Sequence, residues 1–172
     1  MFANGKLNIK NIDHVGYVVR DLDKTTKYFW EVLGIGPWEF MEFGPNVEKY
    51  KYYGKEDKLL VKIAEARVGD VSIELIQPVS GPSPHRDFLE KHGEGMQHLG
   101  ILVDSYQDVE EMKKLGYTVM IEGTGIGDSK DGFCYYLDTE KEIGCVIECC
   151  VYPSDPSSLH YYKIYPEPSE QK

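Results

Sequence analysis

MQHLGILVD, residues 96–104, decides the fold, because an earlier stretch of the chain has the same design. IDHVGYVV, residues 12–19, also places a glycine two residues after a histidine and continues as an apolar run toward an acidic segment. His98 follows His14 by 84 residues. Short apolar runs bounded by turn signals are typical of buried strands. The sequence therefore predicts two strands that begin two copies of one unit.

A second pair of stretches repeats in the same way. VSIELIQP at 71–78 and CVIECCVYP at 145–153 each place a glutamate after an isoleucine within an apolar run that ends near a proline. These glutamates, Glu74 and Glu148, are 74 residues apart, so the two copies differ in length by ten residues. Each unit thus carries a histidine on its first strand and a glutamate on its last strand.

The stretches between these strands predict the same order of elements in both copies. Asp21 is an N-cap signal for a helix that runs to about Val32. Strands are then expected at 38–43, 59–68 and 71–77, with a loop or an exposed hairpin at 44–58. In the second copy, a helix near 107–115 is followed by strands at 117–122, 132–137 and 144–151, with a glycine-rich loop at 123–127.

These elements predict an α+β fold in which two βαβββ modules pair about a pseudo-twofold axis. Their strands would form one curved, barrel-like mixed sheet that encloses a metal site. We expect a single domain at residues 10–153, with module one at 10–78, a linker at 79–95 that holds a short helix, and module two at 96–153. Residues 154–172 are expected to be a C-terminal extension with little core of its own.

The composition excludes several classes of function. The chain has 172 residues and a formal net charge of −10, whereas nucleic-acid binding needs clustered Lys and Arg. It has no apolar run long enough to span a membrane and no N-terminal signal segment, so a cytoplasmic location is the default expectation. Its four cysteines lack zinc-binding spacing. Cys149 and Cys150 are neighbours on a predicted strand, so they should point to opposite faces as reduced thiols.

The repeat predicts where the chemistry lies. If the two modules pair with their concave faces together, the two histidines and two glutamates converge around one point. Two imidazoles and two carboxylates suit one divalent metal ion such as Zn, Ni, Co, Mn or Fe. A carboxylate on an apolar strand is costly to bury without a partner, which also favours a cation. We therefore predict a metal site made by His14, Glu74, His98 and Glu148.

The pattern resembles the vicinal oxygen chelate superfamily, which includes glyoxalase I, extradiol dioxygenases, bleomycin-resistance proteins and methylmalonyl-CoA epimerase. The likeness covers residues 12–151 and is closest to the epimerase branch, above all in FLEKHGEGMQH at 88–98. The resemblance implies the same four metal ligands. Gln97-His98 stands where the family usually has two histidines. The epimerase base falls near residues 62–65. If the matching position is Ile63, that base is missing here, and Glu65, two residues on and on the same strand face, is the candidate to replace it. Relatives of this kind suggest a homodimer.

Three functions remain open from the sequence. The first is a metal-dependent epimerase or isomerase that removes a proton next to a carbonyl through a metal-stabilised enolate, with Glu148, Glu74 and Glu65 as candidate catalytic bases. Its substrate would be a small molecule with two chelating oxygens, such as an acyl-CoA or a keto acid. The second is a glyoxalase I-like lyase or an extradiol-type dioxygenase, although a fourth protein ligand crowds the latter. The third is a non-catalytic binding protein of the drug-resistance type.

Other polar residues have two interpretations each. Tyr17 and Tyr135 would either line the cavity or pack in the core, which is the commoner role of strand tyrosines. His85, Arg86 and His92 flank the linker, where they would either meet an anionic group of the substrate or remain solvated at the surface.

Overall fold

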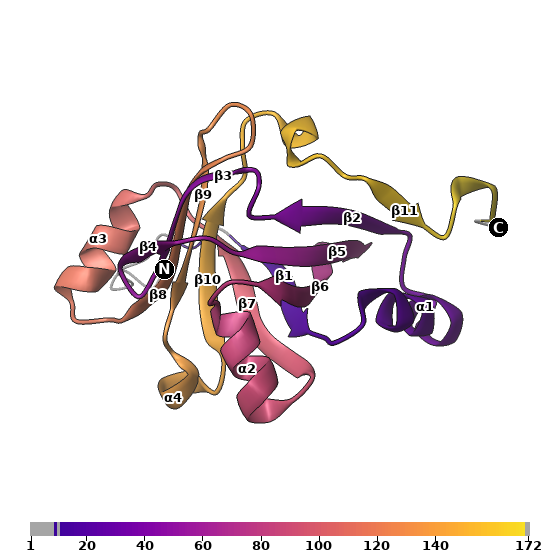
Figure 1. Cartoon of the computed structure of the whole chain (residues 1–172), viewed down its shortest axis with the longest axis horizontal. Helices are drawn as coiled ribbons and strands as arrows, with labels where there is room; N and C mark the ends of the chain where they lie inside the picture. Colours follow the sequence, from indigo (N-terminus) through magenta and orange to yellow (C-terminus); the bar gives the residue numbers. More distant parts are fainter. Residues whose placement is uncertain (1–8, 10, 171–172) are drawn as a thin grey trace.

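The computed structural model describes residue 9 and residues 11–170, and it has an α+β fold built on one mixed sheet (Figure 1). The sheet has eleven strands and curls into a half-barrel. The strands are β1 (Ile12–Val18), β2 (Trp38–Phe43), β3 (Val47–Tyr52), β4 (Lys55–Asp57), β5 (Leu60–Val68), β6 (Val71–Ser80), β7 (Gly95–Leu102), β8 (Val119–Ile126), β9 (Gly132–Leu137), β10 (Val146–Val151) and β11 (Lys163–Tyr165). The helices are α1 (Leu22–Leu33), α2 (Pro84–His92), α3 (Gln107–Lys114) and α4 (Glu140–Ile143), with short 3-10 turns at Pro156–Leu159 and Pro168–Glu170.

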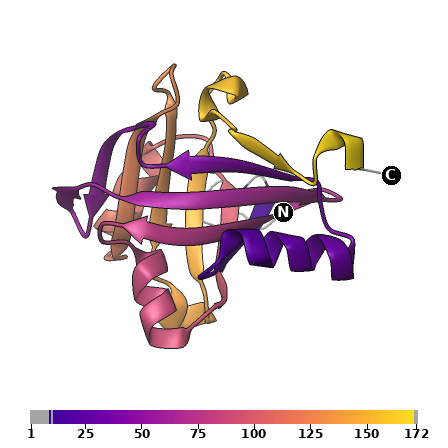
Figure 2. The same ribbon diagram turned by 45° about the vertical axis from the view of Figure 1, so that its right-hand side comes forward.

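The strand order has the predicted pseudo-twofold arrangement. It runs β11-β2-β5-β6-β1-β7-β10-β9-β8-β3-β4. At the centre, β1 and β7 pair antiparallel, and each has its module's last strand, β6 or β10, as a parallel neighbour. Strands β2, β5 and β6 run across the direction of β8, β9 and β10, so the sheet folds over on itself (Figure 2). The predicted fold class is confirmed.

Both outer edges of the modules are extended by strands that the repeat does not contain. Strand β3 of the tyrosine-rich hairpin pairs with β8 of the second module. Strand β11, from the segment after residue 153, pairs with β2 of the first module. Leu159 of that segment is buried in the interior core, so the extension adds to the core of the half-barrel.

The expectation of a glycine-rich loop at 123–127 is wrong, because β8 continues to Ile126. Gly123 pairs with Cys134, and a Cβ at that glycine would lie only 3.2 Å from the Cys134 sulfur. The small residue therefore permits close strand packing where the sequence pattern indicates a turn. Helix α4 was not expected from the sequence.

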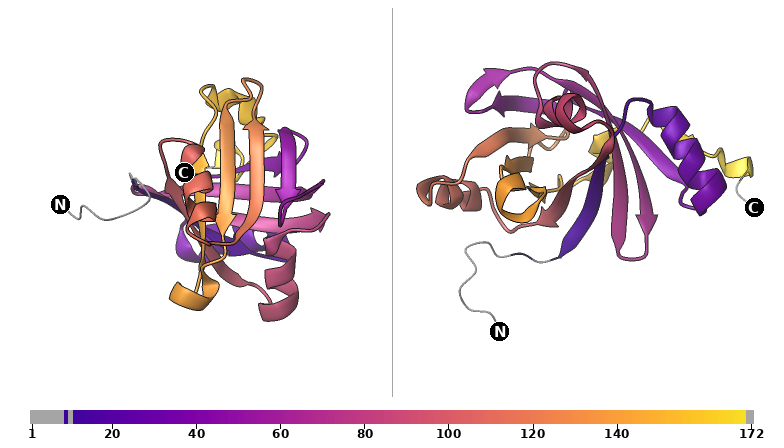
Figure 3. Two further views of the ribbon diagram at one scale, coloured as in Figure 1. Left: turned by 90° about the vertical axis from the view of Figure 1, so that its left-hand side faces the viewer. Right: turned by 90° about the horizontal axis from the view of Figure 1, so that it is seen from below.

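Alternating side chains divide the core into three clusters. The interior of the half-barrel holds residues of both modules, including Ile63, Ile76 and Val146. On the outer faces, α1 covers module one around Trp38 and Leu75, and α3 covers module two around residues such as Tyr135. Figure 3 shows these two helices on opposite outer sides of the sheet. The concave interior is thus left for a site.

The cysteine prediction is confirmed by the same alternation. Cys149 packs in the outer cluster of module two and Cys150 in the interior cluster, and all four cysteines are free thiols. Among the described residues, no helix has the length and the apolar composition needed to cross a bilayer.

Candidate metal centre

The two repeated histidines meet because each glycine two residues later makes room for the histidine of the other module. Across the central β1–β7 pair, His14 lies opposite Gly100 and Gly16 lies opposite His98. A Cβ built on Gly16 would lie 1.9 Å from the His98 ring, and one on Gly100 would lie 2.1 Å from the His14 ring. No side chain fits at either position. The His-x-Gly repeat is therefore a packing requirement of the site.

The glutamates join the same face of the sheet from the flanking parallel strands. Glu74 on β6 lies beside Gly16, and Glu148 on β10 lies beside Gly100. Residues directly opposite one another on neighbouring strands point to the same face. Each glutamate thus reaches past a glycine toward the histidine beyond it, and all four side chains come to the concave interior.

The four side chains form one compact buried group. Their ligand atoms all lie within 4.8 Å of one another. The Nε2 atoms of His14 and His98 are 3.3 Å apart, and Glu148 Oε2 lies 3.1 Å from the first and 3.2 Å from the second. Glu74 Oε2 is farther away, at 3.6 Å and 3.3 Å. The convergence inferred from the sequence repeat is therefore present in the structure.

Neighbouring side chains hold both imidazoles by the opposite ring nitrogen. His14 Nδ1 lies 3.0 Å from Asp13 Oδ2, and His98 Nδ1 lies 2.9 Å from Gln97 Oε1. Because each Nδ1–H donates to an oxygen, each Nε2 faces the centre of the group. Hydrogen-bonded histidines of this kind are typical of metal ligands, whose ring orientation and basicity are set by the outer partner.

The charges within the group favour a cation. Burial lowers the pKa of His14, but Glu74, Asp13 and Glu148 together raise it well above the ordinary value for histidine. For Glu148, burial raises the pKa, and the hydrogen bonds from His14 and His98 more than reverse this, so that its pKa is strongly lowered. The Glu148 carboxylate therefore stays ionised beside two imidazoles.

The donor set fits a divalent metal ion. If both imidazoles are neutral, their Nε2 lone pairs face each other at 3.3 Å and need a shared positive charge between them. Glu74 Oε2 is buried and has no hydrogen-bond partner in the described part of the chain, so this oxygen is also available to a cation. Nitrogen and oxygen ligands of this kind suit zinc and the neighbouring transition metals.

A small cavity of about 70 Å³ opens from this group. His14, Glu74 and Glu148 form part of its wall, together with His85 and Tyr136. The remaining lining is mainly apolar and comes from both modules and the C-terminal segment: Met41, Phe43, Val61, Ile63, Ile76, Ile121, Ile126, Phe133, Cys134, Cys150, Val151, Tyr152, Pro153 and Leu159. The group thus has an apolar chamber beside it in which a small organic molecule could bind.

Glu65 points to the same face of the sheet as Glu74, its direct neighbour across β5 and β6. It lines an adjoining cavity, with Asp13, Arg67 and Ser72, and is not part of the wall of the cavity beside the metal centre. Burial is the largest cause that raises its pKa, and the charge of Glu74 adds to this, against a hydrogen bond with Ser72. Glu65 is therefore a partly buried carboxyl group near the centre with an increased affinity for a proton.

The remaining polar residues considered from the sequence lie partly in the core and partly at the surface. Tyr135 is fully buried in the outer core of module two, and Tyr17 packs beside the outer core of module one. His92 is partly exposed, with Nε2 2.8 Å from a Glu140 oxygen, and the Arg86 side chain donates to the Gly81 carbonyl. His85 is only 3% exposed, so a solvated position for it is wrong.

Sequence reasoning missed Tyr136, Asp13 and Gln97 as members of the site. Tyr136 is the direct neighbour of Glu148 across β9 and β10, so counting the register back from Glu148 identifies it. Asp13 and Gln97 each precede a ligand histidine, a position that the repeat itself marks. Tyr152 also supports the site, because its hydroxyl donates to Asp13 over 2.7 Å. No pattern in the sequence marks this tyrosine.

Comparisons with known proteins identify relatives of this chain. Residues 13–135 match the model of the Glyoxalase/Bleomycin resistance protein/Dioxygenase superfamily. The uncharacterized protein YqjC of Bacillus subtilis is 23% identical over 152 residues, which cover 88% of this chain and 99% of that protein. The mitochondrial methylmalonyl-CoA epimerase of Bos taurus is 28% identical over 122 residues, covering 70% of this chain and 62% of the bovine protein.

A solved structure shows the same fold. A variant of the methylmalonyl-CoA epimerase of Streptomyces coelicolor, in complex with 2-nitronate-propionyl-CoA, superposes with a TM-score of 0.58 at 20% identity. The match covers 83% of this chain and 97% of that structure.

Proposed function

The chain belongs to the glyoxalase/bleomycin resistance protein/dioxygenase superfamily, and from that premise we propose that it is a divalent-metal-dependent epimerase or isomerase. The reaction is the removal of a proton from a carbon next to a carbonyl group and its return to the same or a neighbouring position. The observation that carries the proposal is the buried group of His14, Glu74, His98 and Glu148 at the end of an apolar cavity.

The four side chains would hold one divalent ion, with positions left for two oxygens of a substrate. When bound, such an ion lowers the pKa of a C–H bond next to a chelated carbonyl by stabilising negative charge on the oxygens. The protein then has to orient the substrate, exclude water and supply a base. The apolar cavity wall supports the first two tasks, because it confines a small molecule and keeps the local dielectric low.

Glu74 is the best-supported base among the candidates. Both glutamates lie near both histidines, but Glu148 Oε2 is the closer, at 3.1 Å and 3.2 Å from the two Nε2 atoms, against 3.6 Å and 3.3 Å for Glu74 Oε2. A less closely held carboxylate can turn toward a substrate carbon at lower cost. Glu65, the neighbour of Glu74 across the sheet, is the candidate to take the proton onward, since its pKa is already raised.

The substrate is proposed to be a small oxygen-chelating molecule with an apolar part, and acyl-CoA thioesters are the first class to test. The support for thioesters comes from the epimerases named above, one of which binds a propionyl-CoA derivative. The cavity beside the centre is small and mainly apolar, which supports a short apolar acyl part as its occupant. A coenzyme portion would therefore extend outside it.

Metal analysis and proton exchange test the proposal. The purified protein is expected to hold about one divalent ion per chain after reconstitution. In D₂O it should incorporate deuterium next to the carbonyl of at least one member of a panel of acyl-CoA esters and 2-keto acids, and only when loaded with metal. Metal binding without exchange, combined with O₂ consumption on catechols, would replace the proposed reaction by a dioxygenase reaction.

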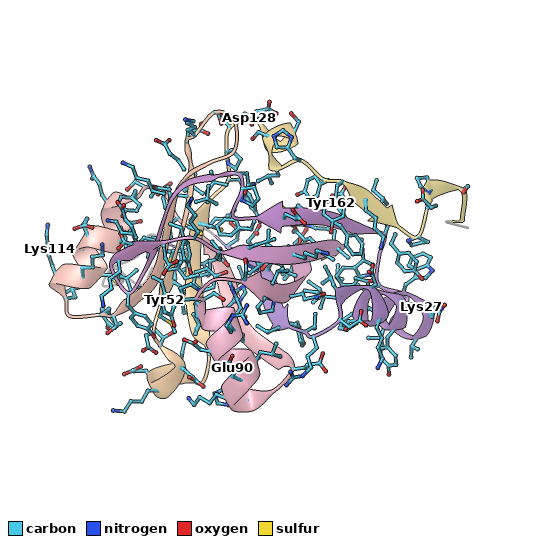
Figure 4. All side chains as sticks on the ribbon, viewed as in Figure 1. Lys27, Tyr52, Glu90, Lys114, Asp128 and Tyr162 are labelled. Carbon is cyan, nitrogen blue, oxygen red and sulfur yellow. The ribbon has the colours of Figure 1, made fainter. Side chains whose placement is uncertain are left out.

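Variants connect this activity to the centre. His98→Ala is expected to abolish stable metal binding and exchange. His160→Ala is a matched control, because His160 is an exposed histidine whose ring lies 3.0 Å from Asp128, in the loop that Figure 4 shows at the far edge of the molecule. Normal metal content and exchange in His98→Ala would contradict the proposal.

A further inference from the structure

Leu159 lies between the cavity beside the metal centre and two larger cavities. The cavity beside the centre has a volume of about 70 Å³, whereas the two neighbouring cavities have volumes of about 500 Å³ and 610 Å³. Among the described residues, only Leu159 lines all three, and its side chain is buried in the interior core. At this point one side chain closes the small cavity off from the larger two.

The small cavity extends from the metal centre toward this leucine. Glu148, Cys150 and Tyr152 occupy every second position along β10 and just beyond its end, and all three line the cavity. Because each strand residue adds about 3.3 Å, the wall from Glu148 to Tyr152 is about 13 Å long. Tyr152 and Leu159 also line the larger cavity of 610 Å³ together. A molecule held at the centre can therefore extend along β10 toward Leu159.

Close packing fastens the segment that carries Leu159 to module two. Pro153 and Ser158 lie against the turn between β8 and β9, where two glycines leave room for them. A Cβ on Gly127 would lie 2.5 Å from the Ser158 hydroxyl oxygen, and one on Gly132 would lie 3.0 Å from Pro153. The segment therefore fits this position only because both residues lack a side chain.

The same segment is fixed in its turn and at its far end. Asp155 starts the 3-10 turn Pro156–Leu159 by accepting from the Ser157 N–H at 3.0 Å. Beyond the turn, the Tyr162 N–H donates to the Phe40 carbonyl over 2.8 Å, and β11 pairs with β2. Figure 2 shows this segment in yellow, passing from β10 over the end of the half-barrel to β11. The leucine is therefore held in place between the two modules.

We propose that Leu159 is a specificity-determining residue that limits the length of the apolar part of the substrate. The inference rests on the proposed function and narrows its substrate class to oxygen chelators with a short apolar chain. A chain that ends before Leu159 gains apolar burial with each carbon atom. A longer chain has to displace a side chain that is packed in the interior core, which is unfavourable in a close-packed protein.

The test uses the full chain loaded with Co²⁺, whose visible absorption reports ligands at the metal. Straight-chain 2-keto acids from pyruvate to 2-oxodecanoate form a series that differs only in length. In the wild-type protein, affinity should rise about fourfold with each added methylene and then fall by about tenfold where the chain meets Leu159. In Leu159→Ala the fall should move to acids longer by about two carbons, and in Leu159→Phe it should move to shorter acids.

Leu137→Ala is the matched control for Leu159→Ala. Leu137 is also buried, but it packs in the outer core of module two and lines none of the three cavities. Its truncation removes the same atoms from a core position, so it reports a general loss of packing. The Leu137→Ala variant should keep the length profile of the wild-type protein.

Each result points to one conclusion. A wild-type affinity that rises through the whole series would overturn the inference without the need for any variant. An unchanged profile in Leu159→Ala and Leu159→Phe, or the same shift in Leu137→Ala, would also overturn it while leaving metal binding and proton exchange intact. Failure of the wild-type protein to bind Co²⁺, or no spectral response to any acid, would instead count against the proposed function.

Discussion

The two halves of the metal centre contain the same residue types but are supported differently. In module one, His14 is held by the carboxylate of Asp13, while Glu74 has an oxygen without a hydrogen-bond partner in the described part of the chain. In module two, His98 is held by the neutral Gln97, while Glu148 contacts both histidines. The repeat thus supplies a symmetric set of ligands, in which Glu148 Oε2 lies somewhat closer to the two histidines than Glu74 Oε2 does.

Under the proposed function, this difference would divide the tasks between the two modules. A centre used only to hold an ion has no need for a loosely held carboxylate, whereas a centre that transfers protons needs one ligand that can move. Module two would then anchor the ion, and module one would provide the reacting group.

The largest effect is expected from the paired glycines, which the two halves share. Gly16→Ala and Gly100→Ala would each place a Cβ against a buried imidazole, at 1.9 Å and 2.1 Å, and should lower the free energy of unfolding by about 3 kcal/mol. Urea unfolding of the metal-free protein measures this. Gly95→Ala on the same strand as Gly100 is the control, since its Cβ would come no closer than 3.9 Å to Phe88. Similar stability of all three variants would contradict the packing argument.

Substitution of the two glutamates should affect Zn²⁺ affinity and deuterium exchange to different extents. Glu148→Gln removes the carboxylate that contacts both histidines, and we expect the affinity for Zn²⁺ to fall about a hundredfold. Glu74→Gln should lower affinity only about tenfold yet abolish deuterium exchange in the metal-loaded protein. Competition with a chelating dye gives the affinities. Exchange that persists in Glu74→Gln would assign the base to Glu148 or Glu65.

Substitution of Asp13 and Gln97, which hydrogen-bond the two histidines, should have smaller effects on Zn²⁺ binding. Gln97→Leu is expected to weaken Zn²⁺ binding roughly tenfold, and Asp13→Asn somewhat more, because a carboxylate raises imidazole basicity more than an amide does. The same dye competition measures both. Asp128→Asn, a change in an exposed loop, is the control and should bind Zn²⁺ like the wild-type protein. A larger loss in Gln97→Leu than in Asp13→Asn would reverse the proposed difference between the halves.

The smallest expected effect is a release of protons. The pKa of His14 is raised well above its ordinary value in the metal-free protein, so His14 is protonated at neutral pH and must lose that proton to bind a metal ion. Calorimetric titration in buffers of different ionisation enthalpy should detect release on the order of one proton per ion. The Asp13→Asn variant should release fewer protons when it binds the ion, because the pKa of its His14 is raised less. Binding without proton release would show that His14 is neutral before metal binds.

Much of the fold and the centre was predictable from local patterns. The repeated His-x-Gly and Ile-Glu stretches predicted two modules, their central strands and the four converging side chains, because residue types and strand periodicity are written directly in the sequence. The turn at Gly69, the helix N-cap at Asp21 and the helix end at Gly34 also follow from local chemistry.

Long-range pairing was not predictable in the same way. The hairpin of β3 and β4 belongs to module one by sequence but extends the edge of module two, and β11 extends the edge of module one from the C-terminal segment. His85 has no apolar pattern around it that marks a buried residue, and its burial depends on how the hairpin fastens α2. Such contacts depend on which distant surfaces meet when the sheet curls.

The sequence by itself determined the two modules, the His-x-Gly requirement and the chemical types of the ligands, since these depend on residue type and on spacing along single strands. Only the tertiary structure decided which side chains support the two histidines, which cavity Glu65 lines and that His85 is buried beside His98. The last two properties arise from side chains that are far apart in the sequence, and their partners exist only after the half-barrel has closed.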